Sequence, residues 1–117
     1  MTLNSYKDLL VWQKGIDLVN EVYILTKQLP KDEQFGLVSQ MRRAAVAIPS
    51  NIAEGYRRNH KAEYRHFLAI AFGSAAELET QLIIIEKQYK IIDIKSSQLI
   101  LEEVLKMLNT IISKLKD

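Results

Sequence analysis

The residues best suited to chemistry in this sequence are its arginines. All five lie within 24 of the 117 residues: Arg42, Arg43, Arg57, Arg58 and Arg65. Between Arg42 and His66 the chain has six formal positive charges and two negative ones, so this segment carries +4 while the whole chain carries +2. A guanidinium donates two parallel hydrogen bonds to a phosphate or a carboxylate. The segment therefore predicts a surface that binds anions.

Two interpretations of this surface stay open. In the first, it binds RNA or DNA, and Tyr56 and Tyr64 stack on unpaired bases. The cations assigned to nucleic-acid binding are then Arg43, Arg57, Arg58, Lys61 and Arg65. In the second, the charges solvate the outer face of a helix and pair with Glu54 and Glu63, while Arg42 pairs with a carboxylate at a subunit contact. Clustered positive charge alone does not separate the two.

Patterns for catalysis or metal binding are weaker. The chain has no cysteine, which excludes thiolate metal sites and cysteine nucleophiles. Glu63 and His66 match once the Glu-x-x-His spacing of diiron bundles, but such a site needs two pairs and two further inward glutamates. No serine has a matching histidine and acid, and the glycines form no phosphate loop. We therefore expect a protein that is not an enzyme and has no metal or cofactor.

Helices must position these residues. Apolar side chains recur at three- and four-residue steps over about 8–29, 33–58, 61–90 and 96–116. We expect Asp8 near the start of the first helix, as N-cap or first-turn acid, and Ser96 or Ser97 as N-cap of the fourth. The links are short, and short links between long helices produce antiparallel neighbours. The sequence thus predicts one all-α domain over 1–117, an antiparallel up-down four-helix bundle.

Two of these segments carry specific expectations. In the second, Pro49 removes a backbone hydrogen bond, yet the apolar phase continues from Ile48 to Ile52. We therefore predict one helix that is kinked at the proline. In the first, we predict a core-facing stripe of Leu9, Trp12, Ile16, Val19, Tyr23 and Thr26.

The third segment carries two apolar series. The first series, between Tyr64 and Tyr89, is the predicted core stripe. The second lies about a third of a turn away and suits either a contact between identical subunits or a broad surface facing its own core. As a subunit contact, it uses small residues for close approach. The predicted interface consists of Arg42, Arg65, Ala69, Phe72, Gly73, Ala76 and Ile83.

The compartment is predicted from what the sequence lacks. The N-terminus has no charged start followed by an apolar run, so no secretory signal is expected. No stretch approaches the ~20 uncharged apolar residues that span a bilayer. We expect a cytoplasmic protein without a membrane partner.

Three stretches resemble the four-helix bundle proteins of the 23S rRNA intervening-sequence family. They are residues 8–14 (DLLVWQK), 36–55 (GLVSQMRRAAVAIPSNIAEG) and 67–79 (FLAIAFGSAAELE). The family consists of small bacterial proteins, some encoded within insertions in large-subunit rRNA genes. Related accessory proteins of diversity-generating retroelements form basic, barrel-like homopentamers that engage a reverse transcriptase and nucleic acid. The resemblance implies a homo-oligomer of four-helix protomers, a pentamer, whose further partner is RNA, DNA or a protein.

Overall fold

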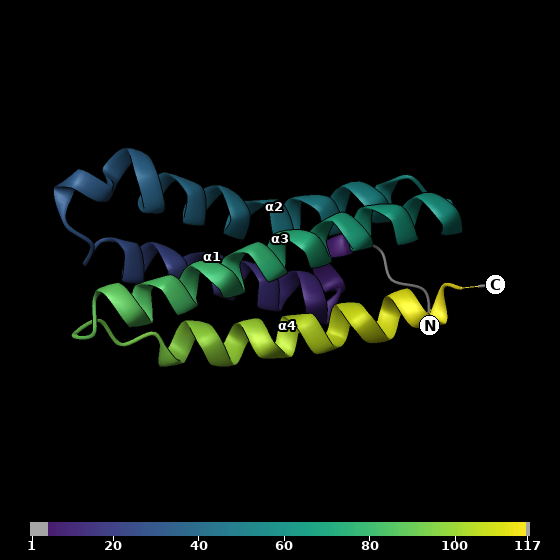
Figure 1. Ribbon diagram of the computed structural model, residues 1–117. Helices are drawn as coiled ribbons and strands as arrows, with labels where there is room; N and C mark the ends of the chain where they lie inside the picture. The colour runs from purple at the N-terminus through teal and green to yellow at the C-terminus, as the bar shows by residue number, and fades with distance from the viewer. Residues whose placement is uncertain (1–4, 117) are drawn as a thin grey trace.

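The computed structural model describes residues 5–116, and this part of the chain is helical throughout, with no strand (Figure 1). Three short helices, η1 (Tyr6–Asp8), η2 (Lys31–Glu33) and η3 (Gln34–Val38), flank the long ones. The long helices are α1 (Leu10–Thr26), α2 (Ser39–Arg57), α3 (Lys61–Gln88) and α4 (Lys95–Lys114). The predicted all-α fold with four main helices is confirmed.

Each long helix packs against two others. α2 contacts α1 and α3, α4 also contacts α1 and α3, and the α2–α3 contact is the most extensive. Figure 1 shows the chain turning back between α2 and α3 and again between α3 and α4. The bundle measures 45 × 21 × 20 Å. Its core is aliphatic, and its largest fully buried side chains include Leu18, Met41, Ile48, Ile52, Leu68, Leu78, Ile85, Leu101 and Leu108.

The stripe predicted for α1 is offset from the buried face: Thr26 is buried, Leu9, Trp12 and Val19 only border the core, and Tyr23 is exposed. The buried face consists of Val11, Gly15, Leu18, Val22, Leu25 and Thr26. Gly15 is where α1 approaches α2, since a Cβ added there would lie 3.4 Å from the Cβ of Pro49. A glycine has no apolar side chain, so an apolar pattern does not reveal that this position is buried. Gly15 thus lies on the buried face of α1, where the two helices approach closely.

The second predicted helix begins differently from expectation. Residues 31–38 form η2 and η3 rather than the first turns of a continuous α-helix, and the backbone at Gly36 is non-helical (φ −107°, ψ −108°). α2 then continues through Pro49, which is buried inside it. The kink at Pro49 stays a prediction. The recorded break in helical geometry lies at Gly36, where no side chain restricts the backbone.

Two predicted helix starts were also wrong. The position before α1 is Leu9, which makes no side-chain cap, and Asp8 belongs to η1, whose N-cap is Ser5. α4 begins at Lys95, and the Asp93 carboxylate accepts a hydrogen bond from the Lys95 amide at 2.9 Å. Ser97 is buried instead of capping the helix. Both errors arise because several cap-forming residues occur near each start, and the sequence does not rank them.

α3 is the most apolar helix in the described residues. One 18-residue window has a mean hydropathy of 1.5, so by length and composition alone this helix could cross a membrane. Burial accounts for part of this apolar character, since Leu68, Ala71, Ala75, Leu78 and Leu82 are buried in the bundle core, but only 39% of the window is buried. These residues confirm the predicted core stripe.

Candidate functional site

The structure divides the five arginines into two groups. Arg42 and Arg43 lie near the beginning of α2, whereas Arg57 and Arg58 lie at its end, next to Arg65 in the first turns of α3. At 1.5 Å per residue, Arg43 and Arg57 are separated by about 21 Å along the helix axis. The cluster in the sequence is therefore two separate sites on the molecule.

At the α2–α3 turn, Arg58 is held by its own chain. Its guanidinium contacts the carboxylates of Glu54 at 3.0 Å and Glu63 at 3.4 Å. It also lies 5.2 Å from the ring centroid of Phe67. The sequence-based expectation that Glu54 and Glu63 pair with nearby cations describes this arrangement. Arg58 thus ties the end of α2 to the first turn of α3, and little of its charge is left for a ligand.

Two other cations of the turn, Arg57 and Arg65, are more available than Arg58. Arg57 is exposed and its guanidinium lies 5.7 Å from the ring centroid of Tyr6. Arg65 is exposed and forms no hydrogen bond or ion pair with the part of the chain that the structure describes. Lys61 is exposed at the first position of α3, where it already has an interaction partner within the protein. We name Arg57, Lys61 and Arg65 the turn cations.

The two tyrosines beside the turn pack against one another. The rings of Tyr56 and Tyr64 meet edge to face with their centroids 5.8 Å apart. Burial, and secondarily the neighbouring Tyr56, raises the pKa of Tyr64. Gly55 makes this packing possible, because its bare backbone lies against Phe67 and Tyr64. Neither ring stands free as a stacking platform for a base.

Arg42 is fixed by two contacts with α1. Its Nε donates a hydrogen bond to Oγ1 of Thr26 at 3.0 Å, and its guanidinium lies 4.3 Å from the ring centroid of Tyr23. Thr26 is only 2% exposed, and its hydroxyl donates to the Val22 carbonyl at 2.8 Å. Arg42 is half-buried and lies at the border of the core. Its two Nη groups form no hydrogen bond or ion pair with the described residues, so they are a preoriented pair of donors.

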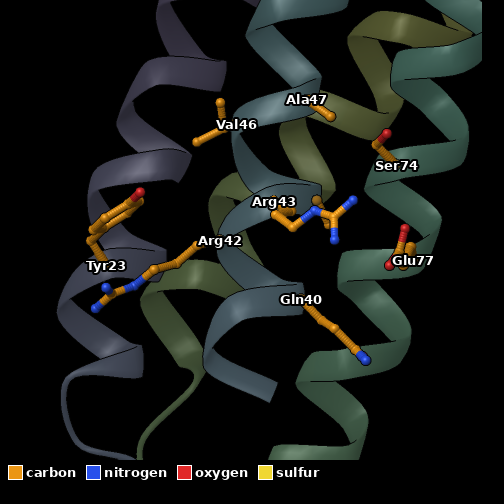
Figure 2. A pocket seen from close by; sticks show the side chains of 9 residues that line it. Tyr23, Gln40, Arg42, Arg43, Val46, Ala47, Ser74 and Glu77 are labelled. Atoms are coloured by element: carbon orange, nitrogen blue, oxygen red, sulfur yellow. The ribbon is translucent and has the colours of Figure 1, made fainter. Parts of the chain in front are cut away.

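Arg42 and Arg43 lie in one shallow open groove of about 810 Å³ across the outer side of α2 (Figure 2). Figure 2 shows Arg42 extending toward Tyr23 on α1, and Arg43 extending the other way, toward Ser74 and Glu77 on α3. Arg43 forms no hydrogen bond or ion pair with the described residues. No sequence pattern marks this groove, because its walls come from three helices. Its lining is Tyr23, Gln40, Arg42, Arg43, Ala44, Val46, Ala47, Ser74 and Glu77.

The second stripe of α3 remains largely outside the core. Ala69 and Ala76 are exposed, Ile83 is 45% exposed, and Phe72 is half-buried against the core. A Cβ added at Gly73 would have no neighbouring atom within 4 Å. A broad surface facing its own core therefore does not describe this stripe, apart from Phe72. Its role as a subunit contact stays a prediction.

The Glu-x-x-His pattern has a local explanation. Glu63 contacts Arg58, and the ring of His66 lies edge-on to Phe67 with centroids 5.4 Å apart. Among residues 5–116, no three His, Cys, Asp or Glu side chains gather in a group that could hold a metal ion.

Comparison with known proteins identifies one family. A family model described as 23S rRNA-intervening sequence protein matches residues 7–111, which span α1 to α3 and most of α4. No curated protein matches the sequence.

Proposed function

The chain belongs to the 23S rRNA-intervening sequence protein family, and on this basis we propose that it is a non-enzymatic homo-oligomer that binds RNA as an accessory protein. The observation that carries the proposal is the pair of exposed arginines Arg57 and Arg65 at one end of the bundle, with exposed Lys61 beside them. Guanidinium and ammonium groups are the usual ligands of phosphate oxygens in nucleic-acid complexes.

Three turn cations per protomer make a weak site on their own. Each phosphate that a cation neutralises releases counterions, and this release supplies most of the affinity of a non-specific complex. In the proposed homo-oligomer, which we take to be a pentamer, the same end of every protomer contributes to one surface. Repetition converts the later contacts into intramolecular ones and raises the apparent affinity without new chemistry.

The local ion pairs refine the set of binding residues. Arg58 is paired with two carboxylates, so it is a poor phosphate ligand. Arg43 has an available charge but lies about 21 Å from Arg57 along α2. We therefore place the main RNA contact on the turn cations, and Arg43 at its edge or outside it.

Fluorescence polarisation with a structured RNA at several salt concentrations tests the proposal. The wild type should bind at low salt, and log K should fall linearly with log salt. The double variant R57A/R65A should flatten that slope by about 1.4 to 1.8 for each protomer that contacts the RNA, since each lost phosphate contact removes ~0.7 to 0.9. The matched control is Lys106→Ala, which removes an exposed cation from α4.

Two results would contradict this function. One is no binding at low salt by the assembled wild type. The other is a double variant with the slope of the wild type. A duplex DNA of the same sequence, measured in parallel, decides which nucleic acid the surface prefers.

A second function is a purely structural or protein-binding oligomer. Two observations support it: Arg42 is fixed by its own chain with two donors left over, and the second stripe of α3 is exposed. An Arg that is oriented in advance and flanked by Tyr and apolar residues is typical of the centre of a protein interface. The two functions are compatible if Arg42 serves assembly and the turn cations serve RNA.

A further inference from the structure

The α1–α2 and α3–α4 edges of the bundle lie on opposite sides. α1 packs against α2 and α4, and α3 packs against the same two helices, so the four helices form a closed circuit. In such a circuit, a side chain in the α1–α2 seam faces away from one in the α3–α4 seam. In a closed dimer, the patch on the α1–α2 seam therefore cannot meet the α3–α4 patch of the other copy at both contacts. In a head-to-tail arrangement, the α1–α2 patch of each copy can meet the α3–α4 patch of the next copy.

The first patch, on the α1–α2 edge, consists of Tyr23, Arg42 and Val46, and we name it the arginine patch. Arg42 is anchored through Nε to Thr26, which leaves its Nη donors without a partner in the described chain. Around this cation lie two large side chains that are unusually exposed for their type, Tyr23 at 37% and Val46 at 40%. The patch offers a bidentate donor within an apolar rim, and it lacks a carboxylate.

The second patch, on the α3–α4 edge, consists of Glu79, Ile83 and Glu102, and we name it the glutamate patch. The three residues line one narrow cleft of about 70 Å³ between α3 and α4. Both glutamates are exposed and form no ion pair with the described residues. Ile83 is 45% exposed beside them. The patch offers two carboxylates next to an apolar side chain, so it complements the arginine patch in charge and in apolar character.

The two patches also lie at similar heights along the bundle. Arg42, Arg43 and Glu77 line the same groove, which places the start of α2 beside this part of α3. Glu79 is two residues from Glu77, a rise of about 3 Å. Neighbouring copies can therefore stand side by side with their axes roughly parallel, without sliding along one another.

We propose that the arginine patch of one copy docks on the glutamate patch of the next copy, with Arg42 bridging Glu79 and Glu102. The contact is heterologous, so repeating it produces a closed ring when the rotation between copies closes. It assigns the exposed second stripe of α3 to the subunit contact through Ile83. This inference rests on the proposed homo-oligomer and names the surfaces that build it; the turn cations stay outside the contact.

Light scattering after size exclusion of the full chain provides the test. Arg42→Glu should dissociate the assembly to the 13.5 kDa protomer or raise its dissociation constant at least about tenfold, because it sets like charges opposite one another. The double variant E79R/E102R should do the same. The triple variant R42E/E79R/E102R reverses both patches in one chain and should restore the wild-type mass, which neither misfolding nor a different interface would do.

Controls separate the possible failures. Lys106→Glu reverses a charge on the exposed side of α4 and should leave the mass unchanged. Arg42→Lys keeps the positive charge but removes the paired donors of the planar guanidinium, so it should weaken assembly in part. Far-UV circular dichroism must show that each variant is helical.

Each outcome has a definite meaning. A monomeric wild type would overturn both the homo-oligomer and this contact. A wild-type oligomer that tolerates R42E and E79R/E102R would overturn the contact alone, as would a triple variant that stays dissociated while its helicity is intact. A wild-type dimer would also overturn the contact, because opposite patches cannot close in two copies.

Discussion

Gly55 of α2 lies so close to Phe67 of α3 that a Cβ on Gly55 would stand 2.7 Å from the Cβ of Phe67. The same added atom would lie 3.2 Å from the Tyr64 carbonyl oxygen. Backbone and Cβ atoms cannot swing aside as a long side chain can. The most extensive helix contact of the bundle therefore depends on a missing side chain.

Gly55→Ala should destabilise the protein by about 1 to 3 kcal/mol, because overpacking outweighs the higher helix propensity of alanine. Urea unfolding measures the change. The matched control is Gly73→Ala on α3, where an added Cβ meets nothing within 4 Å. There the protomer should gain up to about 1 kcal/mol. Equal stabilities for the two variants would show that α2 and α3 can separate at no cost.

Thr26 should couple energetically to Arg42. Thr26→Val removes the hydroxyl that accepts from Arg42 and donates to the Val22 carbonyl, at a cost of about 1 to 2 kcal/mol. In a double-mutant cycle with Arg42→Ala, unfolding should give a coupling of about 0.5 kcal/mol or more. Strict additivity would mean that the hydrogen bond does not hold Arg42 in place.

The hydrogen bond between Tyr89 and Glu33 of η2 should make the stability of the protein sensitive to alkaline pH. The Tyr89 hydroxyl donates to the Glu33 carboxylate at 2.5 Å, and this bond, with burial and nearby acids, raises the pKa of Tyr89 to about 12. A raised pKa in the folded state means that the stabilising contribution is complete below pH 10 and disappears as pH rises through 12.

Ultraviolet titration of tyrosinate checks this pKa. The wild type should show one tyrosine that ionises near pH 12, and this step should vanish in Tyr89→Phe. Glu33→Gln should return the pKa of Tyr89 toward its ordinary value, since the acceptor loses its charge. An unchanged high-pH step in both variants would assign the raised pKa to another tyrosine.

Arg58 should matter for the fold and not for RNA. Its two carboxylate partners are exposed, so Arg58→Ala should cost no more than about 1 kcal/mol in unfolding. The salt dependence of RNA binding should stay that of the wild type, in contrast to R57A/R65A. A slope that flattens as much for Arg58→Ala as for Arg57→Ala would show that its ion pairs open for phosphate.

Two isoleucines on α3 offer a matched pair for assembly. Ile83, in the second stripe, is 45% exposed, and Ile70, on another side of the helix, is 40% exposed. Ile83→Asp should dissociate the oligomer, whereas Ile70→Asp should leave its mass unchanged, because only Ile83 lies in the glutamate patch. Analytical ultracentrifugation distinguishes the two. Equal behaviour of both variants would remove the second stripe from the interface.

Local signals in the sequence were sufficient for the outline of the fold. The four main helices follow from apolar recurrence and from stops such as Pro30, which act within a few residues. The core stripe of α3 was also predictable, since its buried residues keep one helical phase from Leu68 to Ile85. The exposure of Arg43 has a local cause, because Arg43 and the buried Met41 are two residues apart and so face opposite sides of α2.

What the tertiary structure alone decided concerns contacts between helices. In the folded protein, Gly15 on the buried face of α1 lies close to Pro49 of α2. The folded protein also gives each arginine different contact partners. Arg58 is neutralised by Glu63 across the turn, whereas Arg42 is held by Thr26, 16 residues away in the sequence. Periodicity reports which residues share a face of one helix. The rotation and separation of two packed helices depend on every side chain between them, so these partners appear only when the helices are docked.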